Sequence, residues 1–143
     1  MSGPTFHLVT QVEPNDCARA VCAMITGRSL AEVTRETRTT PGGLRFSEVA
    51  GYLNRYGWHV GGYGSGVGRF IFWRRNNPSW LLVRNQSRTG WHSVLWDGHQ
   101  VLDPEPANAG RKLREYAVAE NWPLLKWVTD REAGDVGEAD YHL

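Results

Sequence analysis

The spacing of hydrophobic residues changes character near Gly57, and this change limits the folds open to the chain. Before it, apolar residues recur at helical spacing, which predicts helices over residues 16–26, 29–37 and 46–56. After it, short runs of aromatic and β-branched residues bounded by turn residues predict strands. Helices first and strands afterwards indicate an α+β fold, in which an N-terminal helical half packs on an antiparallel β-sheet.

The second half of the chain is expected to consist mainly of short strands. The predicted strands cover residues 58–60, 70–73, 80–84, 91–96, 99–102 and 124–128, with one further helix over 111–120. The glycine-rich stretch 61–68 is too flexible for a helix or a packed strand, and it lacks the Lys-Ser/Thr ending of a phosphate-binding loop. We expect this stretch to form a flexible wall beside a cleft.

Chain length and charge limit the classes of protein that fit. The 143 residues suit one domain with its own core, which we place at 1–129, followed by an acidic, flexible tail at 130–143. The net charge of +1 argues against a nucleic-acid or membrane-surface binder. No signal peptide or membrane-spanning run is visible, so we expect a cytoplasmic protein.

A predicted β-hairpin brings a histidine and an aspartate together. Asp97 and Gly98 form a strong type I′ turn pair between two strand-like runs. A two-residue loop would place His92 directly opposite Asp103, with both side chains on one face of the sheet. The carboxylate would then accept the Nδ1 proton of the imidazole and leave Nε2 as the base. A slip of one residue in the register would destroy this pairing.

A candidate nucleophile lies in the first turn of the first predicted helix. Asn15 and Asp16 are good N-cap residues, so Cys17 follows directly where unpaired backbone N–H groups and the helix dipole favour an anion. This environment lowers the pKa of a thiol, and a neighbouring imidazolium lowers it further. Gln11, six residues upstream, is placed to offer its side-chain amide to an oxyanion beside the Cys17 N–H.

Neither a disulfide nor a metal site is expected. Cys17 and Cys22 are five residues apart on one predicted helix, so their side chains point well apart, and we assign Cys22 to the core. His7, His59 and His142 show no ligand spacing with the cysteines or with each other. No metal or organic cofactor is therefore implied.

Four segments together resemble a known family of enzymes. These are Gln11, the helix start Asp16-Cys17-Ala18, the run Trp91-His92-Ser93-Val94 and the run Val101-Leu102-Asp103-Pro104. They are similar to the papain-like cysteine peptidases of the C39 type. In that family a glutamine stands six residues before the catalytic cysteine, a histidine lies on a strand, and an aspartate lies in an Asp-Pro pair after the next strand.

The resemblance implies a papain-like fold and a cysteine hydrolase that acts on peptide or isopeptide bonds. Its catalytic residues would be Cys17, His92, Asp103 and Gln11, and its partner would be a peptide or protein substrate. The family is best known for removing double-glycine leader peptides from bacteriocin precursors, often as a domain of an exporter. This chain differs in having Ala18-Arg19 where a small pair such as Gly-Pro is common, and we expect a stand-alone domain.

Three other functions remain open on the sequence. One is a papain-fold thiol amidase or acyltransferase of the NlpC/P60-like kind. The second is a catalytically silent papain-fold protein that binds a partner protein, against which the complete Gln–Cys–His–Asp set argues. The third is a nucleic-acid binder that uses arginines among aromatic residues, but the balanced charge favours a solvated sheet edge instead.

Overall fold

The computed structural model describes residues 5–37, 42–61, 64–65, 77–85 and 90–126. Three α-helices come first along the chain: α1 (Cys17–Thr26), α2 (Leu30–Thr37) and α3 (Phe46–Arg55). The strands and 3₁₀ helices that follow are β1 (Trp58–Val60), β2 (Gly64–Ser65), β3 (Ser79–Arg84), β4 (Trp91–Trp96), β5 (Val101–Leu102), η1 (Pro106–Asn108), η2 (Leu113–Glu115) and β6 (Val118–Lys126).

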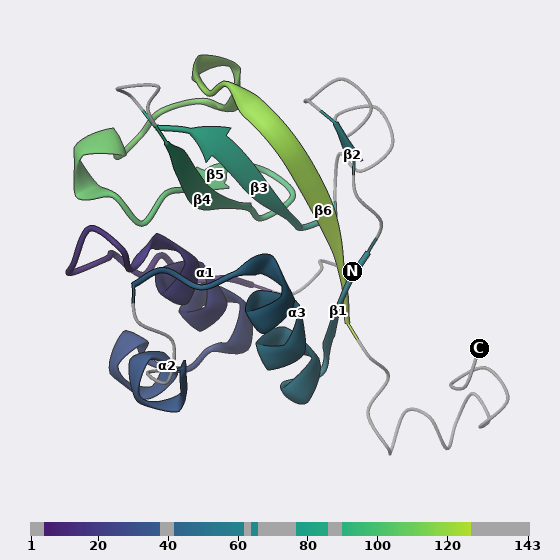
Figure 1. The fold of residues 1–143 in the computed structure, drawn as a ribbon. Helices are drawn as coiled ribbons and strands as arrows, with labels where there is room; N and C mark the ends of the chain where they lie inside the picture. The colour runs from purple at the N-terminus through teal and green to yellow at the C-terminus, as the bar shows by residue number, and fades with distance from the viewer. Residues whose placement is uncertain (1–4, 38–41, 62–63, 66–76, 86–89, 127–143) are drawn as a thin grey trace, which may run out of the picture.

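The strands form an antiparallel sheet in the order β1-β6-β3-β4-β5, and β2 pairs with β6 beside this path. Helices α1, α2 and α3 gather on one side of the sheet, as Figure 1 shows. The predicted α+β class, with N-terminal helices packed on an antiparallel sheet, is therefore confirmed. Within the described part of the chain, no helix combines the length and apolar character needed to cross a membrane.

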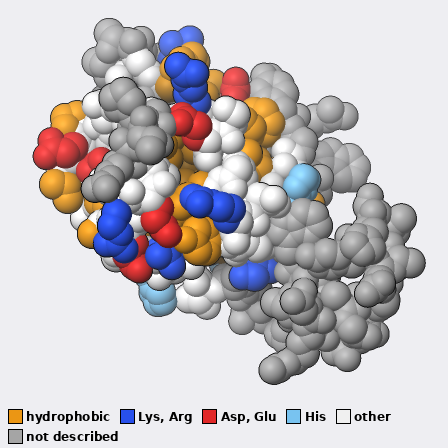
Figure 2. Space-filling model, turned by 60° about the horizontal axis from the view of Figure 1, so that its bottom comes forward, with side chains coloured by type: hydrophobic (Ala, Val, Ile, Leu, Met, Phe, Trp, Pro, Cys, Tyr) orange, Lys and Arg blue, Asp and Glu red, His pale blue; other side chains and the backbone are white. Residues whose placement is uncertain are grey.

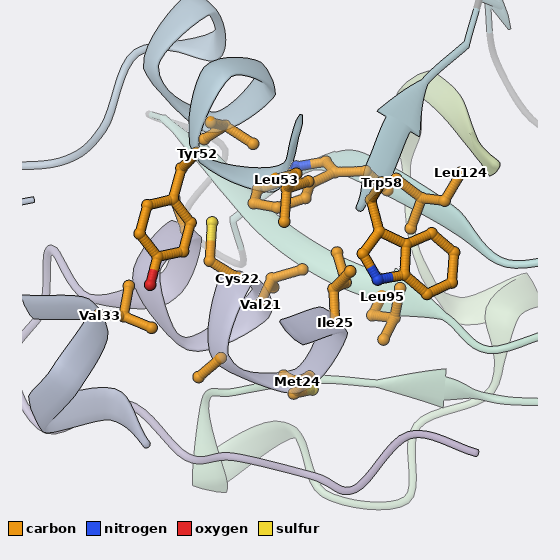
Figure 3. Packing of buried hydrophobic residues seen from close by; sticks show 14 of the residues in the cluster. Val21, Cys22, Met24, Ile25, Val33, Tyr52, Leu53, Trp58, Leu95 and Leu124 are labelled. Atoms are coloured by element: carbon orange, nitrogen blue, oxygen red, sulfur yellow. The ribbon is translucent and has the colours of Figure 1, made fainter. Parts of the chain in front are cut away.

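The main core lies between α1 and the sheet. Val21 and Cys22 of α1 are fully buried and pack with Leu53 of α3 and Leu95 of β4, as Figure 3 shows. Burying one such apolar side chain stabilises a fold by about 1.5–3 kcal/mol. The cluster fixes α1 against the sheet, so the first residue of α1 has a defined position relative to β4. The assignment of Cys22 to the core is confirmed.

A second cluster packs on the other face of the sheet. It consists of Leu81, Val83, Val94, Trp96 and Tyr116. Tyr116 comes from the segment after η2, so this cluster fixes that segment over the sheet.

Arg19 of α1 is buried although it lies opposite the apolar stripe of the helix. It is 5% exposed, and its Nε donates to Thr37 Oγ1 at 2.8 Å, while its other nitrogens donate to the carbonyl oxygens of Thr37 and Gly42. These bonds join α1 to the end of α2.

On the face drawn in Figure 2, acidic and basic side chains of the described residues lie interspersed with hydrophobic ones.

The strand predictions over 58–60 and 91–96 have the same bounds as β1 and β4, and β3 begins one residue before its predicted start. The predicted helix over 111–120 is wrong. That segment forms the 3₁₀ turn η2 and then enters β6, because β6 pairs with β1 on one side and β3 on the other. Pairing on both sides outweighs a local helical preference. The predicted strand 124–128 is the end of β6, while the predicted strand 70–73 and the proposed tail 130–143 lie outside the described residues.

Candidate active site

The turn between β4 and β5 differs from the predicted two-residue hairpin. Leu95 pairs with Leu102, so four residues connect the strands, and the register is shifted by two from the predicted one. Asp97 stabilises the longer turn, because its carboxylate accepts the N–H groups of His99 and Gln100 at 2.8 Å each. A shift of two residues leaves every side chain on its original face.

His92 and Asp103 therefore still meet, as neighbours on one face of the sheet. His92 Nε2 lies 2.6 Å from Asp103 Oδ1, and both side chains are largely buried. The expected choice of ring nitrogen is wrong, because Nε2 and not Nδ1 faces the carboxylate. Nδ1 is consequently the ring nitrogen left for the Cys17 thiol, with which the His92 side chain is hydrogen-bonded.

The Asp103 carboxylate is held by four donors. Oδ1 accepts from His92 and from the N–H of Glu105 at 2.8 Å. Oδ2 accepts from Asn108 Nδ2 at 3.0 Å and from the Tyr116 hydroxyl at 2.7 Å. Burial would raise the pKa of Asp103, but these hydrogen bonds and the His92 charge outweigh it and lower that pKa. The carboxylate is thus held ionised with its orientation fixed.

Asn108 and Tyr116 are site residues that the sequence reasoning missed. Asn108 ends η1 and is buried, and Tyr116 follows η2 and is also buried. Tyr116 fell inside the segment 111–120 that was expected to be a helix, and a helix would have placed its side chain differently. The available signal was Asp103-Pro104 followed by a turn-rich segment, which favours short turns over a helix.

Cys17 is the first residue of α1, as predicted, but its N-cap acts in an unexpected way. The Asp16 carboxylate makes no cap bond to the helix. Instead, its Oδ2 accepts the N–H groups of Val12 at 3.3 Å and Glu13 at 2.9 Å. Asp16 therefore folds the preceding loop back toward Cys17 and leaves the first N–H groups of the helix available to the sulfur.

The Cys17 sulfur lies at the open edge of β4. Burial would raise the pKa of the thiol, but hydrogen bonds from the His92 side chain and the Ser93 N–H, the His92 charge and the Ala18 N–H together lower it. Ser93 can donate because β5 pairs only with Leu95 and the residue after it, so the earlier part of β4 has no strand neighbour on that side among the described residues.

The histidine carries the complementary shift. Burial would lower the pKa of His92, but hydrogen bonds to Asp103 and Cys17, with their charges, raise it to about 9. A lowered thiol pKa and a raised imidazole pKa favour a thiolate–imidazolium pair at neutral pH.

Gln11 reaches the same site, but its amide is less firmly placed. Its backbone N–H donates to the Pro104 carbonyl at 2.8 Å, which ties the loop to the strand end that carries Asp103. Its side-chain Nε2 donates to the Glu13 carbonyl at 3.4 Å, and its Oε1 is buried with no partner among the described residues. The structure thus brings Gln11 to the side of Cys17, with the amide N–H group engaged elsewhere.

A cleft of about 460 Å³ opens over these residues. Its walls are Gln11, Pro14, Cys17, Val83, Arg84, Asn85, Trp91, His92, Glu105, Ala107, Asn108, Arg111 and Tyr116. Trp91 is 52% exposed and forms part of the wall. Of the glycine-rich stretch 61–68, the structure describes only Gly61, Gly64 and Ser65, so the expected loop wall lies mostly outside the described residues.

Among the described residues, no group of three histidine, cysteine or carboxylate side chains is placed to hold a metal ion.

Solved structures share this architecture. The peptidase domain of Streptococcus ComA, a bi-functional ABC transporter involved in a quorum-sensing pathway, superposes with a TM-score of 0.67 at 17% identity, over 85% of this chain and 99% of that one. A double-glycine motif protease from an AMS/PCAT transporter, solved in complex with the leader peptide, gives 0.64 at 15% identity, over 85% of this chain and 92% of that one.

The chain has the fold of C39-type papain-like peptidase domains. The resemblance seen in the sequence is confirmed for the fold. No protein-family model matches the sequence, and a search of curated proteins finds no match either.

Proposed function

We propose that this protein is a cysteine peptidase or isopeptidase, with Cys17 as nucleophile, His92 as acid and base, Asp103 as the residue that orients His92, and Gln11 in the oxyanion hole. One observation carries the proposal: a single hydrogen-bonded chain runs from the Cys17 sulfur through the His92 ring to the Asp103 carboxylate. Such a chain supplies a charged nucleophile and a positioned proton donor together.

The geometry supports a two-stage acyl transfer. The Cys17 thiolate attacks the carbonyl carbon, a carbon–sulfur bond forms, and negative charge moves to the carbonyl oxygen. His92 then gives its Nδ1 proton to the leaving nitrogen as the carbon–nitrogen bond breaks. Asp103 keeps Nε2–H in place throughout, because that proton stays in the 2.6 Å hydrogen bond.

The second stage returns the enzyme to its starting state. Neutral His92 takes a proton from water as the water oxygen attacks the thioester, and the carbon–sulfur bond breaks. The products are a carboxylic acid and the Cys17 thiolate beside the His92 imidazolium. In both stages the Gln11 amide is proposed to turn from Glu13 toward the developing oxyanion, next to the Cys17 N–H.

A peptide or protein substrate fits this proposal. The similar solved domains are named as peptidases, and one of them was solved with a leader peptide bound. The cleft here is open and is lined by both apolar and polar side chains beside Cys17, as an extended peptide requires.

The decisive test is the rate of Cys17 alkylation by iodoacetamide as a function of pH. We expect rapid labelling of Cys17 well below the pKa of a free thiol in wild type, and slow labelling in His92→Ala. His99→Ala is the matched control, because His99 is exposed in the turn after β4 and does not line the cleft that holds Cys17. An ordinary thiol profile in both wild type and His92→Ala would reject the proposed function.

A further inference from the structure

Two arginines in the cleft have no role in the acyl-transfer chemistry described above. Arg84 at the end of β3 and Arg111 before η2 both line the cleft that holds Cys17 and His92. Arginine presents several N–H donors in a fixed planar fork that matches a carboxylate. The surroundings of each arginine show whether that fork is available to a ligand.

Arg84 is held flat against an exposed aromatic ring. Its guanidinium carbon lies 4.6 Å from the centre of the Trp91 ring, the residue paired with it across β3 and β4. Stacking uses the face of the guanidinium, so its N–H edge stays available to an acceptor. Among the described residues, no carboxylate forms an ion pair with Arg84.

Arg111, which lines the same cleft, is also held against an aromatic ring. Its guanidinium carbon lies 4.5 Å from the centre of the Tyr116 ring, and one of its N–H groups donates to the Glu115 carbonyl. No carboxylate in the described part of the chain neutralises it. The acidic side chain that lines this cleft, Glu105, accepts the Ala107 N–H at 3.2 Å and, within the described residues, forms no ion pair with either arginine.

We propose that Arg84 and Arg111 bind a carboxylate of the substrate close to the bond that is cut. The inference rests on the proposed function, and it narrows the substrate to peptides that carry an acidic side chain or a free C-terminal carboxylate near the scissile bond. Two stacked, unneutralised guanidinium groups in one cleft are a receptor for such a group, since stacking fixes both forks before the ligand arrives.

The first test compares an anionic with a neutral alkylating reagent at Cys17. The ratio of labelling rates, iodoacetate over iodoacetamide, reports the positive charge near the sulfur. We expect Arg84→Gln and Arg111→Gln each to lower this ratio by about threefold, the order of effect of one unit charge within the same solvated cleft. The imidazolium contributes equally in every variant and cancels from the comparison.

The controls separate a local from a general charge effect. Arg114→Gln makes the same change in net charge, but Arg114 is exposed in η2 and does not line the cleft, so its ratio should equal that of wild type. Arg84→Lys keeps the charge and loses the fork, so it should keep the reagent ratio. An unchanged ratio in both Arg84→Gln and Arg111→Gln would overturn the proposal.

The second test identifies the source of the carboxylate by protection of Cys17 from iodoacetamide. The probes are acetyl-Ala-Ala-Glu-Ala-Ala-amide, acetyl-Ala-Ala-Gln-Ala-Ala with a free C-terminus, and the same glutamine peptide as its amide. If the glutamate peptide protects Cys17 more strongly than the glutamine amide does, the site binds a side-chain carboxylate. If the peptide with the free C-terminus protects more strongly, the site binds a terminal carboxylate. Arg84→Gln should weaken the stronger protection by about 10- to 150-fold, as expected for a hydrogen bond to a charged group.

Equal protection by all three peptides, or by none at millimolar concentration, contradicts the proposal. These readouts do not depend on turnover. A carboxylate preference without cleavage of any acidic peptide would therefore support the binding site while rejecting the peptidase function. Cleavage with no preference for acidic peptides would support the peptidase function and reject the carboxylate-binding site.

Discussion

Two parts of the candidate site differ in how firmly hydrogen bonds hold their side chains. In one, the Asp103 carboxylate accepts four hydrogen bonds between 2.6 and 3.0 Å and fixes His92. In the other, the Gln11 amide has one long bond of 3.4 Å to the Glu13 carbonyl and an oxygen with no partner among the described residues. Under the proposed function, this difference implies that His92 and Asp103 are in place before substrate binds, whereas the Gln11 amide reaches its place only as charge develops on the substrate.

The largest expected effect comes from removing the Asp103 carboxylate, the firmly held group of the site. Asp103→Asn would replace an acceptor of four donors by an amide whose NH₂ group faces donors, so buried hydrogen bonds are lost and His92 loses its anionic partner. We expect peptide turnover to fall by about 10³-fold or more and the folded state to lose about 3–5 kcal/mol. Steady-state kinetics and urea unfolding measure the two losses. Activity within a few fold of wild type would show that Asp103 does not act through His92.

Gln11→Ala tests the role of the weakly held Gln11 amide. If Gln11 acts only when the oxyanion forms, turnover should fall by about 10²- to 10³-fold while the rate of iodoacetamide labelling stays unchanged, since alkylation produces no oxyanion. Single-turnover kinetics and labelling of the same preparation compare the two reactions. A parallel fall in both would mean that Gln11 shapes the resting site, and the contrast between the two parts would disappear.

Tyr116→Phe removes one of the four donors to Asp103 and leaves the ring that supports Arg111. We expect about tenfold lower turnover and a loss of about 1.5–3 kcal/mol, the value of a buried hydrogen bond to a charged group. Tyr52→Phe is a matched control, because Tyr52 is buried and its hydroxyl donates to the Glu36 carboxylate at the same 2.7 Å, away from the cleft. It should lose stability and keep activity. Equal activity losses in the two variants would rule out a positioning role for Tyr116.

The smallest effect concerns the pH dependence of stability. In the folded chain the pKa of the Cys17 thiol is lowered and that of His92 is raised to about 9, so the proposed thiolate–imidazolium pair holds one proton, on His92. Between the ordinary pKa values of a free imidazole and a free thiol, about 6.5 and 8.5, the unfolded chain also holds one proton, on the thiol. The folded and unfolded states then bind the same number of protons at these two groups, so the pair does not change the free energy of unfolding with pH.

In Cys17→Ala the folded and unfolded states no longer bind the same number of protons. Asp103 still raises the pKa of His92, so the folded variant holds a proton that the unfolded chain has lost. Stability should then fall relative to wild type as pH rises through this window, by about 1–2 kcal/mol in urea unfolding at pH 6 and pH 9. Cys17→Ala/His92→Ala should lose the slope. A parallel pH profile in wild type and Cys17→Ala would contradict a thiolate–imidazolium pair.

The sequence allowed the α+β class and the positions of Cys17, His92 and Asp103 to be predicted, because these depend on local signals. A helix start, a strand and a turn can each be read from a few neighbouring residues. The hairpin register was wrong by two residues, but the contact survived, since an even shift preserves the face on which His92 lies.

Other features of the site depend on contacts between distant segments and could not be read locally. The ring nitrogen of His92 that faces Asp103 depends on the orientation of the ring in the folded site, which the sequence does not give. Asn108 and Tyr116 reach Asp103 only because β6 pairs inside the sheet and draws the preceding segment into 3₁₀ turns. The buried state of Arg19 likewise depends on the end of α2, to which its helix gives no clue.

The short length of β5 has a consequence for solubility as well as for chemistry. An uncovered strand edge is a template onto which a second chain can add, and natural proteins usually block it with charge, a bulge or a cover. Here the start of α1 lies against that edge, and the Ser93 N–H that would recruit a foreign strand is used by Cys17. The proposed nucleophile therefore has a second effect: its sulfur occupies a backbone donor that this strand edge would otherwise offer to another chain.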